Sequence, residues 1–172
     1  VDRCEDMTGM AAAAQTVSNE IEQKNIQNVI SIGVGTAILE YHLQKELPDR
    51  SLLCSDYASE VVTALKKVSN EFTDIITLDI TADSIADYSD FVFLISRVDA
   101  DLSNAEWRTV FERLFDHEIK DVILIASQPI SWITALKMRL RNIHRARRGD
   151  KFSLVSFKRT QESVEALWNG YY

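Results

Sequence analysis

The chain has 172 residues, of which 46% are hydrophobic and 26% charged, and its formal net charge is −7 at neutral pH. This length suits one domain with a sizeable core. The acidic charge argues against a protein that coats nucleic acid through overall attraction. No apolar run approaches the roughly 20 residues of a membrane helix. Cys4 and Cys54 form no disulfide or zinc pattern, so we expect a cytoplasmic protein.

The first 27 residues differ from the rest of the chain. They comprise a polar tail and then a helical segment over Ala11–Lys24. We therefore expect an N-terminal tail and helix over 1–27, followed by one α/β domain over 28–172.

Short apolar runs rich in β-branched residues recur along this domain, and they lack the alternation of half-exposed strands. Such runs are typical of strands buried on both faces of a parallel sheet. The five predicted strands are Asn28–Val34, Ser51–Ser55, Asp74–Ile80, Phe91–Ile95 and Val122–Ala126.

Segments of helical periodicity lie between these runs. Leu39 and Leu43 belong to a stripe that Pro48 ends, and Ser103 with Glu106 has the spacing of a capping box. Pro129 suits the first position of a further helix. We read the chain as strand followed by helix five times over, which predicts a doubly wound, mostly parallel sheet with helices on both faces.

A glycine-containing turn follows the first predicted strand. Gly33 and Gly35 allow a sharp turn and a close backbone approach to a ligand, since neither has a Cβ. Ligands of open α/β sheets bind at the carboxyl ends of the strands, near the first one. A tight turn that binds nothing is the structural alternative.

Acidic residues end the next two predicted strands. Asp56, followed by Tyr57, ends the second, and Asp79, followed by Ile80, ends the third. A carboxylate after the second strand is suited to accept from both hydroxyls of a ribose. We expect both acids to share a crevice with the glycines, although each alone could serve as a helix N-cap.

These motifs, in this order, resemble those of class I S-adenosylmethionine-dependent methyltransferases, over roughly residues 26–128. The resemblance implies a Rossmann-like methyltransferase fold and S-adenosylmethionine as cofactor. It places Gly33 and Gly35 under the methionine part, Asp56 on the ribose, and Asp79 with Ile80 at the adenine. Tyr57 directly follows Asp56, the residue that would hold the ribose. Ser96 and Arg97 would flank the cofactor and its methyl group.

The chain departs from the family's pattern at two positions. Ser31 stands where the family usually has Glu or Asp, and Ala37 where it usually has Gly. Ser31 can accept a hydrogen bond but supplies no charge for the ammonium group of the cofactor. In the family an antiparallel hairpin follows the late helix, which we assign to Thr160–Asn169. The sheet is therefore expected to lack that hairpin.

The function implied is methyl transfer to oxygen or nitrogen of a small molecule, with Arg97 and Asp99 as candidate catalytic residues. Asp99 and Asp101 are also spaced to share a cation, to supply a base, or to be solvated. We expect no metal site from the scattered histidines. One alternative is a cofactor-binding or interaction protein without turnover. Another is a dinucleotide-binding protein, although Ile38 stands where that fingerprint needs Gly or Ala.

One stretch of the acidic chain is basic. Residues 137–151 contain most of the Lys and Arg residues of the C-terminal part, 129–172. We expect this predicted helix either to present a solvated face or to contact a phosphate or other anionic group.

Overall fold

The computed structural model describes residues 9–68, 74–127, 131–134, 136, 137, 159–169 and 171. Five strands form one sheet, in which all neighbours are parallel, in the order β3-β2-β1-β4-β5. They are β1 (Asn28–Ile32), β2 (Ser51–Asp56), β3 (Ile75–Thr77), β4 (Val92–Ser96) and β5 (Val122–Ile125). The predicted fold class is confirmed, and the strand order reverses between β1 and β4.

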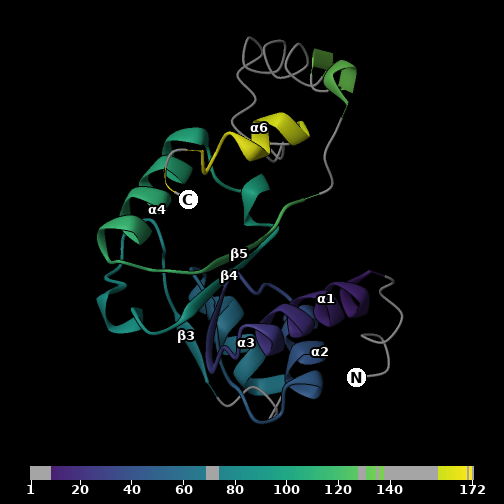
Figure 1. Cartoon of the computed structure of the whole chain (residues 1–172), viewed down its shortest axis with the longest axis vertical. Helices are drawn as coiled ribbons and strands as arrows, with labels where there is room; N and C mark the ends of the chain where they lie inside the picture. Colours follow the sequence, from purple (N-terminus) through teal and green to yellow (C-terminus); the bar gives the residue numbers. More distant parts are fainter. Residues whose placement is uncertain are drawn as a thin grey trace.

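Helices cover both faces of this sheet (Figure 1). The helices α1 (Met10–Gln23), α2 (Ile38–Glu46) and α3 (Ser59–Val68) lie on one side, and α4 (Asn104–Asp116) lies on the other. Alternate residues of a strand point to opposite faces, so β1 packs Val29 in one hydrophobic cluster with α1 and α2, and Ile30 in another with α4. The uninterrupted apolar runs of the sequence follow from this burial on both faces.

The predicted alternation of strand and helix is wrong at one place. Between β3 and β4 the chain forms a single 3₁₀ turn, η1 (Ala86–Tyr88), in place of a helix. Local hydrogen bonds compete with helix formation there. The Asp79 Oδ1 atom accepts from the Thr81 N–H group at 2.9 Å, and the Asp83 Oδ2 atom accepts from the Asp79 N–H group at 2.8 Å. The third strand is accordingly shorter than the predicted Asp74–Ile80.

A capping box fixes the start of α4, as the spacing of its sequence predicts. The Ser103 hydroxyl accepts from the Glu106 N–H group, and the Glu106 carboxylate accepts from the Ser103 N–H group at 2.7 Å. Just before α4, the Leu102 carbonyl accepts a 2.7 Å hydrogen bond from Arg159, which also bonds Asn104. The C-terminal segment is thereby attached to the loop that precedes α4.

The late part of the chain is described only in pieces. The helix expected over Thr160–Asn169 is limited to α6 (Gln161–Glu165), with turns after it. Residues 132–134, 136 and 137 are helical, which agrees with the further helix predicted after Pro129. Pro129 itself and residues 138–158 lie outside the described residues, so the start and end of that helix, the missing hairpin and most of the basic stretch stay predictions. None of the described helices combines the length and apolarity needed to cross a membrane.

Candidate functional site

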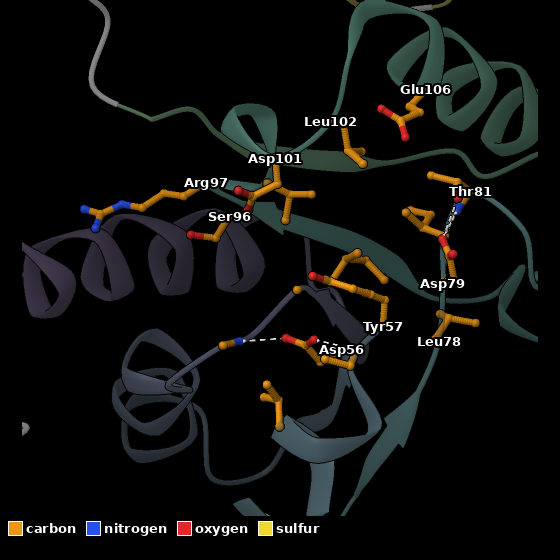
Figure 2. Close-up of a pocket in the computed structure, with 17 residues that line it drawn as sticks. Asp56, Tyr57, Leu78, Asp79, Thr81, Ser96, Arg97, Asp101, Leu102 and Glu106 are labelled. Carbon is orange, nitrogen blue, oxygen red and sulfur yellow. Dashed lines mark hydrogen bonds between the residues drawn. The ribbon is translucent and has the colours of Figure 1, made fainter. Parts of the chain in front are cut away.

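A cavity of about 560 Å³ lies over the carboxyl ends of the central strands (Figure 2). This volume is within the roughly 300–1,000 Å³ typical of small-molecule sites. Its walls come from the loops after β1, β2, β3 and β4 and from the start of α4. The lining residues are Ile32, Gly33, Gly35, Asp56, Tyr57, Ala58, Val61, Leu78, Asp79, Ile80, Thr81, Ser96, Arg97, Val98, Asp101, Leu102 and Glu106.

The glycine turn after β1 has a backbone conformation that side chains disfavour. Gly33 and Gly35 have φ angles of 71° and 53°, both in the left-handed region that glycine adopts at little cost. A Cβ atom at Gly33 would lie 2.6 Å from Cγ2 of Val98. The turn is also tied to β2, since the Gly33 N–H group donates to the Ser55 carbonyl at 2.8 Å. Glycine at position 33 is therefore required by packing as well as by backbone geometry.

Asp56 ends β2 beside this turn and is only 5% exposed. Its Oδ2 atom accepts from the Gly35 N–H group at 3.0 Å, and its Oδ1 atom accepts from the Ala58 N–H group at 2.9 Å (Figure 2). Each carboxylate oxygen has a second lone pair with which to bind a hydroxyl group. The following residue, Tyr57, is 73% exposed at the cavity wall.

Asp79 occupies the corresponding place after β3. Its Oδ1 atom accepts from the Thr81 hydroxyl at 2.6 Å as well as from the Thr81 N–H group (Figure 2). Its Oδ2 atom makes no hydrogen bond within the described residues. The buried Ile80 adds an apolar surface beside this acid. The third strand end therefore offers a polar acceptor next to an apolar patch.

The loop after β4 forms the opposite wall. Arg97 has a φ angle of 61° and an exposed side chain. In Figure 2 its guanidinium group extends away from Asp56 and Asp79. Ser96 and Asp101 also line the cavity. The backbone of Asp99 lies in η2 (Val98–Ala100), but its side chain is outside the described residues.

Glu106 reaches this wall from the first turn of α4, whereas its spacing from Ser103 predicted only a role in capping. The Ser103 hydroxyl and N–H groups lower the pKa of the Glu106 carboxyl. The cavity thus has four carboxylate side chains among its lining residues, against the one guanidinium of Arg97. Its walls favour a ligand with positive charge or hydroxyl donors.

Ser31 does not line the cavity. It is fully buried in β1, and its hydroxyl donates to the Glu40 Oε1 atom at 2.6 Å. Glu40 belongs to α2 and is 2% exposed. Burial raises the pKa of the Glu40 carboxyl to about 7, against the opposing effect of the Ser31 hydrogen bond. The sequence signal for Glu40 was a charged residue directly after Leu39 of the apolar stripe, which the sequence analysis did not use.

Two further expectations concern binding groups elsewhere. Within the described ranges, no three His, Cys, Asp or Glu side chains gather as a metal-binding group. Of the basic stretch 137–151, the structure describes Lys137, which is exposed.

Comparison with known proteins relates the fold, at low identity, to solved methyltransferase structures. No protein-family model matches the sequence, and no curated protein matches it. The methyltransferase domain of bacterial CtHen1-C superposes with a TM-score of 0.64 at 15% identity, covering 94% of this chain and 84% of that one. Human N-acetylserotonin methyltransferase, solved in complex with SAM (S-adenosylmethionine), gives a TM-score of 0.58 at 14% identity, covering 92% of this chain and 48% of that one.

The mitomycin 7-O-methyltransferase MmcR gives a TM-score of 0.57 at 16% identity, covering 91% of this chain and 46% of that one. The chain therefore spans about half the length of the last two structures. Its five-stranded parallel sheet of order 3-2-1-4-5 is typical of the Rossmann-like methyltransferase fold. The protein has the Rossmann-like fold of S-adenosylmethionine-dependent methyltransferases.

Proposed function

We propose that the chain binds S-adenosylmethionine in the cavity at the strand ends and transfers its methyl group to oxygen or nitrogen of a small molecule. One observation carries this proposal. The glycine turn, the acid after β2 and the acid after β3 line a single cavity of suitable volume. Their order along the sheet matches the order of methionine, ribose and adenine in an extended cofactor.

The residues present fit such a ligand. Gly33 and Gly35 have no Cβ atoms and adopt left-handed φ angles, so the turn suits a close approach of the methionine part. Asp56 is held by two backbone N–H groups, and a carboxylate fixed in this way accepts from ribose hydroxyls with little loss of conformational entropy. Asp79 with Ile80 combines an acceptor for the adenine amino group with an apolar contact for the ring.

The bound cofactor supplies a methyl group on a positively charged sulfur, and the acceptor takes that methyl group as the S–CH₃ bond breaks, leaving S-adenosylhomocysteine. The chain's contribution is chiefly to align the acceptor with that bond. In the loop after β4, Arg97 is the proposed group for binding the acceptor, and Asp99 is the proposed group for taking its proton. Two of the structurally similar methyltransferases are named after small molecules, N-acetylserotonin and mitomycin, and this supports a small-molecule acceptor.

A second candidate is a protein that holds the cofactor without turnover. The direction of the Arg97 side chain, away from Asp56 and Asp79, favours this reading. A dinucleotide is a poorer fit, because Ile38 takes the place of the small third residue of that fingerprint and is itself buried at the start of α2.

Calorimetric titration tests the proposal directly. We expect S-adenosylmethionine and S-adenosylhomocysteine to bind with one site per chain, and NADH not to bind. Formation of S-adenosylhomocysteine, followed over a panel of phenols, amines and hydroxylated small molecules, then separates turnover from cofactor holding. Binding of NADH in preference to both adenosyl ligands would overturn the assignment.

A further inference from the structure

A buried hydrogen bond connects the two ends of the glycine turn. Ser31 lies near the end of β1, and Glu40 lies in the first turn of α2. The 2.6 Å bond from the Ser31 hydroxyl to the Glu40 Oε1 atom spans the intervening Gly33–Ala37 segment. The Ser31 carbonyl in turn accepts from the Ser55 hydroxyl at 2.9 Å. The turn is thus held by buried side chains that do not line the cavity.

Few groups near the Glu40 carboxyl could stabilise its negative charge. Among the described residues, no Lys, Arg or His side chain forms an ion pair with it. Its polar partners are the Ser31 hydroxyl and its own backbone N–H group. Burying a charged carboxylate with so few partners is costly. The folded protein without ligand therefore favours a proton on Glu40, which is why its pKa is raised to about 7.

The elements packed with α2 bury mostly apolar or neutral groups. From β2, the Cys54 thiol lies near enough for the Glu40 charge to raise its pKa, after the larger effect of burial, and Asp74 adds to this shift. Asp56 of β2 holds the other side of the turn through the Gly35 N–H group. The neighbouring elements α1 and β4 bury, on this side, Ala14, Val17, Ser18, Ile21, Val92 and Leu94, and the adjacent titratable residues of α2 are Tyr41 and His42.

We propose that Glu40 is a positioning residue for the cofactor, which loses its proton to solvent when a cationic ligand binds on the glycine turn. The carboxylate formed then keeps Ser31 as its donor and holds the turn closed against the ligand's ammonium group. The inference rests on the proposed function, because it needs the cationic methionine end of the cofactor at Gly33 and Gly35. In this proposal Glu40 of α2 supplies the negative charge near the glycine turn. The resembled family usually has an acid for this at the end of β1, where this chain has Ser31.

The proposal predicts two pH dependences of opposite sign. The pKa of Glu40 is raised in the folded state, so its contribution to stability is present below about pH 4.5 and is lost as the pH rises to about 7. Cofactor affinity changes the other way and does so near pH 7, because the ionised carboxyl attracts the cation. We expect affinity to rise about three- to tenfold, the size of a charge interaction that protein and solvent largely screen.

The experiment compares the wild type with Glu40→Gln, which keeps the shape of the side chain but cannot ionise. Glu46→Gln is the matched control, since it removes an exposed carboxylate from the same helix. Urea unfolding without ligand, at pH 5 and pH 8, measures the stability difference. Calorimetry between pH 5.5 and 8.5, in buffers of different ionisation enthalpy, measures affinity and the protons released on binding.

We expect the wild type and Glu46→Gln to lose stability and gain affinity with rising pH, and to release part of a proton on binding near pH 7. Glu40→Gln should show neither dependence. S-adenosylhomocysteine, which keeps the ammonium group, should also release protons, whereas methylthioadenosine, which lacks the amino-acid part, should not. Tight binding without proton release, or the same pH slope in Glu40→Gln, would overturn the role of Glu40 alone. Absence of binding by every adenosyl ligand at any pH would overturn the proposed function and this inference with it.

Discussion

The two sides of the cavity differ in how their polar groups are held. On the side of β1, β2 and β3, Asp56 and Asp79 each accept hydrogen bonds from nearby backbone N–H groups. On the side of β4, Glu106 is held by its capping box with Ser103, but Arg97 is exposed and directed outward, and the neighbouring β5 is only half-buried.

This difference separates a preorganised surface from an adaptable one. Groups already fixed in the free protein lose little conformational entropy when a ligand binds, so they favour affinity. An exposed side chain such as Arg97 can adjust to different ligands, but ordering it costs more conformational entropy. We therefore expect the side of β1 to β3 to determine cofactor binding and the side of β4 to affect mainly what the cofactor reacts with.

The glycine turn gives the strongest test of the preorganised side. We expect Gly33→Ala to lower the free energy of unfolding by about 2–4 kcal/mol, because left-handed strain and the 2.6 Å approach to Val98 add together. Gly35→Ala is the matched control, since it has a similar φ but no atom within 4 Å of its Cβ position, and should cost only about 1 kcal/mol. Equal losses in urea unfolding of the two variants would contradict the packing argument.

Saturating ligand tests whether the cavity as a whole is a cofactor site. S-adenosylmethionine at about 100 times its dissociation constant should add roughly 2.7 kcal/mol of stability, which raises the melting temperature by about 5–10 °C for a chain of this length. Scanning calorimetry with S-adenosylhomocysteine should give a similar shift, and NAD none. An unchanged melting temperature with both adenosyl ligands would show that the cavity does not bind this cofactor.

Asp56 tests one hydrogen-bonding group of that side. Replacing Asp56 with Ala should weaken S-adenosylmethionine binding about ten- to a hundredfold, since charged hydrogen bonds are worth roughly 1.5–3 kcal/mol. Asp49→Ala removes an exposed carboxylate and should bind as the wild type does. Because Asp56 also holds the Gly35 N–H group, circular dichroism should accompany the titration. Unchanged affinity in a folded Asp56→Ala protein would remove this residue from the site.

The smallest effect on cofactor affinity is expected on the other side. Arg97→Ala should change S-adenosylmethionine affinity less than twofold while lowering the rate of methyl transfer to any acceptor that is found. Asp99→Asn should behave in the same way, with or without a chelator. A tenfold loss of cofactor affinity in Arg97→Ala would contradict the view that only the side of β1 to β3 determines cofactor binding.

Much of the fold follows from local sequence patterns. Strands buried on both faces leave uninterrupted apolar runs, and the capping box at Ser103 is a local motif, so both were predictable. The helix expected between β3 and β4 failed because Asp79 and Asp83 bond nearby backbone groups and form turns there. Such competition depends on side-chain geometry, which periodicity does not contain.

The candidate site was predictable where its residues follow strand ends. Gly33, Asp56 and Asp79 line one cavity because parallel strands end at the same edge of the sheet. Glu106 was missed as a lining residue of the cavity, and Glu40 as the buried partner of Ser31, because tertiary packing of α4 and α2 determines both positions. Their roles, like those of Arg97 and Asp99, stay proposals.

The burial of Cys54 has a chemical consequence for the study of this protein. Burial, with a contribution from the Glu40 charge, raises the pKa of this thiol above its usual range, and only the thiolate reacts quickly with alkylating reagents. Cys54 lies two residues before Asp56 in β2, so its modification requires the centre of the sheet to open. Its alkylation rate, followed by peptide mass spectrometry, therefore serves as a built-in reporter of local opening, and a ligand bound at Asp56 should slow it.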